Sequence, residues 1–296
     1  MKNAHLLRRA LSSPWAMDKY YLSVLLGRLL HQAQHDEPTS EEEEPAIELD
    51  DLVEGQVAVI PMHGVLLQHP GIYGGYGGPV VFTEWWGQVF DALVPHPKAA
   101  AVAIDQDTPG GIVYGTPELS DRIYGARGSK PILSVSNALS ASAGYWIGTA
   151  ADQHFVTQSG EVGSIGVYTM HADMSKALED FGVDISLIHA GEFKVEGNPF
   201  EPLSDEARAE LQRYVDEAYD DFLAGVARNR GVDVSKVRDD FGKGRTVTAT
   251  RAVSLGMADA VATLDEVIAR AAQLAGVAPV AALEGRADAR ADFEVR

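Results

Sequence analysis

The sequence holds a serine that could attack a carbonyl group. Ser142 follows a predicted buried strand and opens a short apolar helix, with the small residues Ala141 and Ala143 on either side. Small neighbours let a substrate backbone approach the hydroxyl, and the free N–H groups of a helix N-terminus stabilise a developing oxyanion. Ser142 is therefore a candidate nucleophile, and an ordinary helix N-cap is the alternative.

A second candidate segment is Asp-Thr-Pro-Gly-Gly at residues 107–111, at the end of another predicted strand. Parallel α/β sheets bind their ligands at the C-terminal ends of the strands. Consecutive glycines there leave backbone N–H groups accessible to a ligand. The N–H groups of Gly111 and Ala143 would together form an oxyanion hole. The alternative is a tight turn without a chemical role.

A serine nucleophile needs a general base, and two residues could supply it. Lys194 lies in residues 191–199, after a predicted buried strand at 184–188, and apolar neighbours there would favour its neutral amine. His171, with Asp173 close by, would instead complete a Ser-His-Asp triad. Composition and spacing do not decide between these bases.

The elements that must position these residues alternate between strands and helices. Near-continuous apolar strands separated by helices predict an α/β domain with a mostly parallel sheet. Ser204 is the expected N-cap of a long helix. We expect strands near residues 56–66, 99–104, 131–135, 154–157 and 184–188, and helices near 83–94, 116–126, 145–151, 174–181 and 204–229.

The chain divides into segments of different composition. The apolar run at residues 20–26 is too short to span a membrane, and it is typical of an amphipathic helix over about 17–31. The glycine-rich loop at 71–78 is expected to be a flexible lid or a loop that lines the substrate. We expect an N-terminal helical arm over 1–34, an acidic linker over 35–52, the main domain over 53–275 and a flexible tail over 276–296.

Composition excludes several classes of function. The chain has 296 residues, of which 46% are hydrophobic and 23% charged, and a formal net charge of −19. This acidity argues against phosphate backbones and anionic membranes as main partners. The absence of cysteine rules out a catalytic thiol, disulfides and cysteine-based metal sites. We expect no metal, no organic cofactor, no nucleic-acid partner and no membrane span.

In their order along the chain, these motifs resemble the signal peptide peptidase A family, whose fold is that of the ClpP/crotonase superfamily. The resemblance covers about residues 57–268 and includes Gly-Ser-Ile-Gly-Val at 163–167 and the segment 252–259. It implies an α/β, ClpP/crotonase-like fold of repeated ββα units, with an N-terminal helix and a C-terminal helical segment. A crotonase-type acyl-CoA enzyme would share this fold without the serine and lysine.

The resemblance also implies a role for each candidate residue. Ser142 matches the family's nucleophile, and Lys194 matches its general base, so the implied site is a Ser-Lys dyad. Ser164 matches the serine that orients the lysine. Gly111 and Ala143 match the oxyanion donors; many members have glycine at the position of Ala143, whose N–H remains available.

Within the family, the segment 186–199 and the N-terminal segment ahead of the acidic linker are most similar to the head-maturation, or capsid assembly, proteases of tailed phages. That likeness implies a homo-oligomer, tetrameric or octameric, that degrades scaffold, and in some phages portal or capsid proteins, inside the procapsid in the host cytoplasm. A fused scaffolding segment is not expected in this chain. A cytosolic bacterial peptidase that degrades short peptides and a non-catalytic assembly protein are the alternatives.

Overall fold

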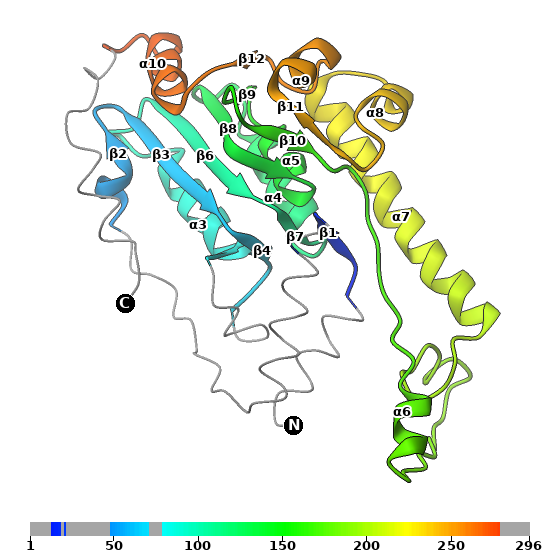
Figure 1. Cartoon of the computed structure of the whole chain (residues 1–296). Coiled ribbons are helices and arrows are strands. Elements are labelled where there is room, and N and C mark those ends of the chain that lie inside the picture. The colour runs from blue at the N-terminus through cyan, green and yellow to red at the C-terminus, as the bar shows by residue number, and fades with distance from the viewer. Residues whose placement is uncertain (1–12, 19–20, 22–47, 71–78, 279–296) are drawn as a thin grey trace.

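The computed structural model describes residues 13–18, 21, 48–70 and 79–278. They form two sheets with helices packed around them (Figure 1). The larger sheet contains β2 (Val53–Glu54), β3 (Val57–His63), β6 (Ala101–Thr108), β8 (Ile132–Ala141), β9 (Gln153–Val156), β10 (Glu161–Gly163), β11 (Thr246–Thr248) and β12 (Ala260–Val261). The smaller sheet contains β1 (Trp15–Met17), β7 (Gly110–Ile112), β4 (Val65–Leu67) and β5 (Val80–Phe82), in that order.

The centre of the larger sheet is parallel. β3 pairs with β6, and β6 pairs with β8, with Val57 beside Ala101 and Val102 beside Ile132. These strands are mostly buried because both faces of a parallel sheet are covered. Their C-terminal ends lie at one edge, where the predicted chemistry-bearing segments begin.

Strands and helices follow one another as repeated ββα units. After β3 the chain forms β4, β5 and then α3 (Thr83–Leu93), and after β6 it forms β7 and then α4 (Thr116–Gly125). β8 leads directly into α5 (Ala143–Gly148). The α/β fold with a mostly parallel sheet and repeated ββα units is therefore confirmed.

The C-terminal part of the main domain is helical, as predicted. Its longest helix, α7, takes Ser204 as its N-cap, because the Ser204 hydroxyl accepts a hydrogen bond from the Ala207 N–H. The remaining elements are η1 (Leu49–Leu52), α6 (Ser175–Asp180), α7 (Asp205–Arg230), α8 (Val234–Asp240), α9 (Ala249–Leu255) and α10 (Leu264–Leu274). In the described part of the chain, no helix is both long and apolar enough to cross a membrane.

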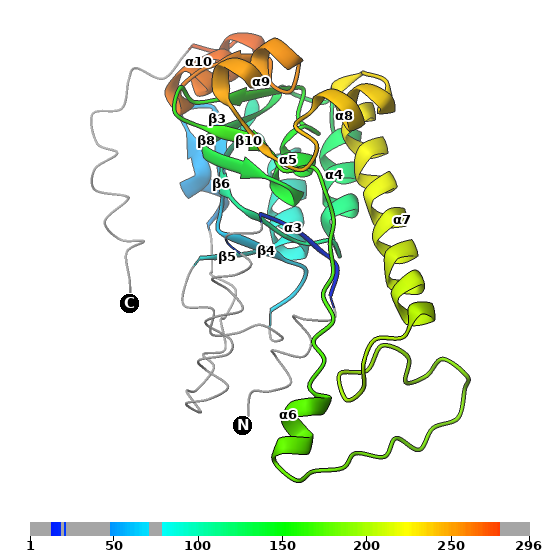
Figure 2. The same cartoon turned by 45° about the vertical axis from the view of Figure 1, so that its right-hand side comes forward.

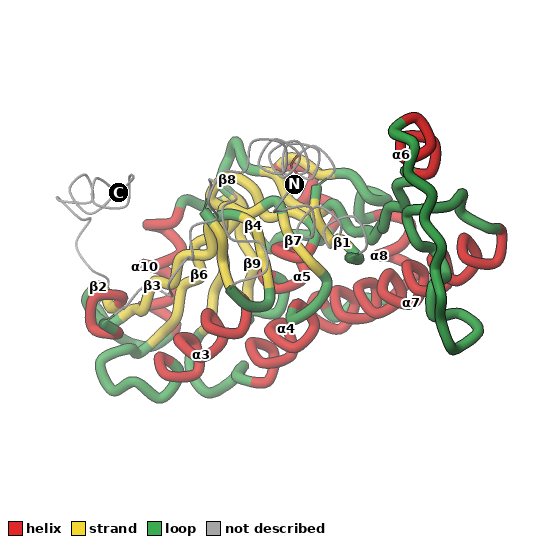
Figure 3. Tube along the Cα trace, turned by 90° about the horizontal axis from the view of Figure 1, so that it is seen from below, coloured by secondary structure: helices red, strands yellow, loops and turns green. Residues whose placement is uncertain are grey.

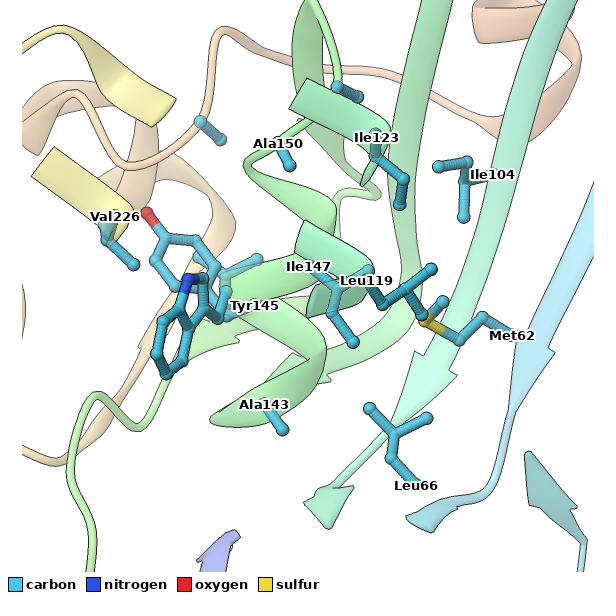
Figure 4. Close-up of a cluster of buried hydrophobic side chains, with 14 of the residues drawn as sticks. Met62, Leu66, Ile104, Leu119, Ile123, Ala143, Tyr145, Ile147, Ala150 and Val226 are labelled. Carbon is cyan, nitrogen blue, oxygen red and sulfur yellow. The ribbon is translucent and has the colours of Figure 1, made fainter. Parts of the chain in front are cut away.

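Helix α5 lies in the middle of the core. Ala143, Tyr145 and Ile147 point into an apolar cluster that also receives Leu119 from α4 and Val226 from α7 (Figure 4). All residues of α5 are buried. A helix surrounded in this way has little freedom to move, so the turn that precedes it is held firmly.

Residues 172–203 leave this body as an extended arm, with α6 near its end (Figures 1 and 2). Seen from below, the arm stands apart from both sheets (Figure 3). The predicted buried strand at 184–188 is wrong: every residue from 181 to 194 is exposed, and Ile188 is 99% exposed. Its sequence has the composition of a strand, but a strand needs a neighbour to pair with, and the described chain provides none there.

The N-terminal boundary also needs correction. Residues 15–17 were expected in a separate helical arm, but they form β1 and pair with β7 of the body. Most of the expected amphipathic helix over 17–31, most of the acidic linker, the glycine-rich loop at 71–78 and most of the tail lie outside the described residues.

Candidate active site

Ser142 occupies the single-residue turn between β8 and α5. Its backbone has φ 55° and ψ −120°, a conformation that side-chain-bearing residues rarely adopt. Such strain costs about 1–3 kcal/mol and persists only where the surroundings enforce it, commonly at active sites. Ser142 is 0% exposed, and its Oγ has no hydrogen-bond partner among the described residues. A strained, buried and unsatisfied hydroxyl is better explained by chemistry than by helix capping.

The backbone around Ser142 is fixed on both sides. The Ser142 N–H donates to the Gly163 carbonyl oxygen at 2.6 Å. The next N–H, that of Ala143, belongs to the first turn of α5, where N–H groups have no acceptor within the helix. A Cβ placed on Gly144 would lie 2.3 Å from Thr108 Cγ2, so the glycine allows α5 to begin this close to β6.

Gln106 is a positioning residue that the sequence analysis missed. Its side chain is fully buried, donates to the Gly144 carbonyl oxygen at 2.9 Å and accepts from Ser140 Oγ at 3.1 Å. These two bonds connect the residues just before and just after the Ser142 turn. The available signal was a polar residue within an apolar strand, directly ahead of the Asp-Thr-Pro-Gly-Gly segment.

Ser164 occupies the equivalent place on the neighbouring strand. β10 pairs in parallel with β8, with Gly163 beside Ala141, so Ser164 follows its strand as Ser142 follows β8. Ser164 also has φ 55°, and its N–H donates to the Arg245 carbonyl oxygen at 2.9 Å. The structure thus brings both predicted serines to the same end of adjacent strands.

The glycine pair of β7 lies against the same turn. A Cβ on Gly111 would lie 1.8 Å from the Leu66 carbonyl oxygen, and a Cβ on Gly110 would lie 3.0 Å from the Ala143 nitrogen. Only glycine fits between these backbones. The Thr108 hydroxyl accepts from the Gly110 N–H at 3.1 Å and so helps to shape the turn into β7. The predicted oxyanion donors, Gly111 and Ala143, therefore lie on adjoining segments.

Lys194 is not brought to this site within the single chain. It lies on the exposed part of the arm, in a turn where its N–H donates to the Gly191 carbonyl oxygen at 3.2 Å. In the described residues no hydrogen bond joins it to Ser142 or Ser164. Among the described residues, the expected apolar surroundings of its amine are not formed, because residues 181–194 are exposed and the strand predicted to precede Lys194 does not form.

The rival base is also away from Ser142. His171 Nε2 lies 3.0 Å from the Asn198 carbonyl oxygen, beside a cleft of about 640 Å³ at the base of the arm. Asp173 accepts instead from the hydroxyl and N–H of Ser175, and these bonds lower the pKa of Asp173. The Ser-His-Asp arrangement is therefore not formed.

His154 is a buried polar residue that packs against Tyr145 of α5. His154 Nδ1 lies 2.7 Å from Ser134 Oγ, and the His154 ring meets the Tyr145 ring edge-on. Burial lowers the pKa of His154 to about 3, with a smaller contribution from Arg230. Tyr145 in turn donates its hydroxyl to the Met257 carbonyl oxygen at 2.8 Å. The imidazole is thus neutral and structural. Among the described residues, no group of three or more side chains that could hold a metal ion occurs.

Comparison with known proteins identifies the family of the chain. The model of Peptidase family S49 matches residues 126–278. The chain is 33% identical to Capsid assembly protease C of Escherichia phage lambda, over 69% of this chain and 46% of that protein. It is 29% identical to Head-tail preconnector protein GP5 of Enterobacteria phage P21, over 79% and 50%. It therefore spans about half the length of these curated relatives.

Two further matches are less extensive or less similar. The chain is 30% identical to a Putative signal peptide peptidase SppA of Enterococcus faecium, over 54% of this chain and 46% of that protein. A solved ClpP1 variant from Listeria monocytogenes is 14% identical, with a TM-score of 0.44, and covers 72% of this chain and 95% of its own. The matched family model spans more than half of the chain and confirms the resemblance seen in the sequence: the chain belongs to Peptidase family S49.

Proposed function

We propose that this chain is a serine endopeptidase in which Ser142 is the nucleophile and Lys194 the general base. The observation that carries the proposal is the strained Ser142 turn, with a buried and unpartnered hydroxyl at the end of a central strand. Membership of a peptidase family supports the same reaction. The peptidase domain comprises residues 53–275 together with β1.

The reaction is acyl transfer to water. The neutral Lys194 amine takes the Ser142 proton, and the oxygen attacks a peptide carbonyl to form a tetrahedral oxyanion. The N–H groups of Gly111 and Ala143 stabilise that charge, and Lys194 returns the proton to the leaving amine. Water then hydrolyses the acyl-enzyme by the same steps. Loss of one oxyanion donor typically costs about 100- to 1,000-fold in rate.

Lys194 lies on the exposed arm of the single chain, so the proposal needs a way to bring this base to Ser142. We assign this delivery to a second copy of the chain, whose arm brings Lys194 beside Ser142 and Ser164. Large apolar side chains on the arm support a homo-oligomer, because contiguous exposed apolar residues mark interaction surfaces; a tetramer or an octamer is proposed from the family resemblance. These side chains are Phe181, Val183, Ile185, Leu187, Ile188 and Phe193.

We base the proposed biological role on the similarity to phage and bacterial peptidases. Similarity to a capsid assembly protease and to a head-tail preconnector protein supports proteolysis during phage head assembly in the host cytoplasm. The proposed substrate is scaffold protein, with portal and capsid proteins as further candidates. The Enterococcus match favours a second candidate, a bacterial peptidase that degrades released signal peptides. Hydrolysis of full-length scaffold, as opposed to short peptides only, separates these candidates.

The dyad is tested by peptidase assays on the full chain with an unfolded protein substrate. Ser142→Ala and Lys194→Ala should each abolish hydrolysis, whereas His171→Ala should retain most of it. Lys176→Ala is the matched control, because Lys176 is another exposed lysine of the arm. An inactive His171→Ala protein together with an active Lys194→Ala protein would contradict the assignment.

A further inference from the structure

Strand β1 lies in the structure as a peptide would lie in a substrate cleft. On one edge it pairs antiparallel with β7, where Asp18 N–H donates to the Pro109 carbonyl oxygen at 2.8 Å. On its other edge, Trp15 and Tyr168 exchange both backbone hydrogen bonds, at 2.9 and 3.1 Å. The segment is thus held by backbone bonds on both edges, between β7 and the chain that follows Ser164.

The register of this pairing puts Ala16 at the proposed oxyanion hole. Val113 N–H donates to the Pro14 carbonyl oxygen at 3.2 Å, and Asp18 bonds to Pro109. Hydrogen-bonded pairs alternate along an antiparallel ladder, so Ala16 and Gly111, midway between them, form the next such pair. The Gly111 N–H therefore faces the Ala16 carbonyl oxygen.

The nucleophile turn meets the same carbonyl. A Cβ placed on Gly110 would lie 2.3 Å from the Ala16 carbonyl oxygen, 2.8 Å from the Ala141 oxygen and 3.0 Å from the Ala143 nitrogen. One point in space is therefore close to Ala16 and to the residues on both sides of Ser142. The Ala16 carbonyl therefore lies beside the proposed oxyanion donors and next to the Ser142 turn.

The side chains of β1 alternate as those of a bound strand do. Trp15 and Met17, 0% and 2% exposed, pack into a cluster with Leu67, Phe82 and Ile112. Ala16 points to the opposite face and joins the cluster that contains Ala143. The cleft therefore fits an extended peptide with a small residue at the nucleophile turn and large apolar residues on either side.

We propose that residues 14–18 are a built-in pseudosubstrate, a segment of the chain that occupies its own substrate cleft and that peptide substrates must displace. The inference rests on the proposed function, because it takes peptides as the ligands of this cleft. It explains why Ser142 is fully buried in the single chain. It also makes the binding of substrate depend on how often β1 leaves the cleft.

Binding of a synthetic peptide tests the proposal without any bond cleavage. The protein is the full chain carrying Ser142→Ala, and the probe is a fluorescein-labelled peptide with the sequence of residues 13–18, measured by fluorescence polarisation. Trp15→Ala removes the largest anchor of β1. If the cleft is open in about 1–10% of molecules, opening it fully should lower the apparent Kd by about 10- to 100-fold.

The controls separate displacement from general destabilisation. Phe90→Ala creates a comparable cavity on α3, away from β1, and should leave the Kd unchanged. Met17→Ala is the second variant should Trp15→Ala fail to fold, and it should also tighten binding. An unchanged Kd in a folded β1 variant, or no binding by any variant, would make β1 a permanent strand and overturn the proposal. If Ser142 or Lys194 lacks its proposed catalytic role, the variants of that residue would still hydrolyse substrate. The lower Kd of the β1 variants would be observed all the same.

Discussion

The Ser142 turn and the arm that carries Lys194 differ in almost every physical respect. The turn is buried, its backbone is bonded to β10, and Gln106 fastens the residues on both of its sides. The arm is exposed from residue 181 to residue 194 and presents apolar side chains to solvent. The first region is preorganised within one chain, whereas the proposed function of the second depends on contact with another copy of the chain.

The largest effect should come from mixing two inactive proteins. Ser142→Ala lacks the nucleophile and Lys194→Ala lacks the base, so each homo-oligomer is inactive. When the two are coexpressed in equal amounts, half of the chains carry Ser142, and half of their neighbours carry Lys194. Specific activity should return to roughly a quarter of the wild-type value, as for a repeated interface that joins two different surfaces. Continued inactivity of purified mixed oligomers would mean that the arm serves its own chain.

The rigidity of the turn is tested by Gln106→Leu. This change removes the partner of the buried Ser140 hydroxyl and the side-chain hydrogen bond to the Gly144 carbonyl, which should lower the free energy of unfolding by roughly 1–3 kcal/mol. Hydrolysis should fall further than stability alone explains, because a small displacement of a nucleophile lowers the rate by up to about 100-fold. The control Gln212→Leu removes an exposed hydrogen bond on α7 and should change neither. Wild-type stability and kcat in the Gln106 variant would show that the turn does not depend on this residue.

The buried His154, which packs against α5, should make the free energy of unfolding depend on pH. Neutral His154, with its pKa lowered to about 3, cannot take a proton in the folded state, whereas an unfolded chain takes one below about pH 6.5. The free energy of unfolding should therefore fall by about 1.4 kcal/mol per pH unit as the pH decreases from 6.5 toward 3, and His154 should contribute no slope above 6.5.

Chemical denaturation of His154→Gln across this range measures that contribution. The variant should lose most of the acid slope, whereas His69→Gln, which changes an exposed histidine, should keep it. Equal slopes in His154→Gln and in the wild type would show that other groups cause the acid sensitivity.

A substitution on the exposed arm should have the smallest effect on the free energy of unfolding. Ile188→Asp places a charge on a side chain that is 99% exposed, so the free energy of unfolding should change by no more than about 0.5 kcal/mol. The same change should dissociate the oligomer in sedimentation and lower hydrolysis. Leu274→Asp, at an exposed position at the end of α10, should do neither. An intact, active oligomer of the Ile188 variant would remove the arm from the proposed interface.

Local patterns in the sequence predicted much of the fold. Alternating apolar strands and helices, and the Ser204 cap, depend on neighbouring residues, and both appear in the structure. The positions of Ser142 and Ala143 at a strand-to-helix turn were predictable for the same reason. Long-range pairing was not: β1 bonds to a strand more than 90 residues away, and the role of Gln106 depends on residues about 35 positions further along the chain.

The strand predicted at 184–188 was wrong for the same reason, because strand formation depends on long-range pairing. Its residue types favour an extended conformation, but a strand becomes stable only when another strand is beside it. The place of Lys194 is equally a matter of which segments come together in space. Neither residue type nor spacing contains that information, so the family resemblance alone chose Lys194 over His171.

The central claim is that Ser142 is a nucleophile activated by Lys194, and covalent labelling tests it most directly. The wild-type protein is treated with a fluorophosphonate, which reacts with activated serines, and the modified residue is mapped by mass spectrometry. The account predicts a single label on Ser142 in the wild type and in Lys176→Ala, and its loss in Lys194→Ala. A label on another serine, or equal labelling of Ser142 in the Lys194→Ala protein, would contradict it.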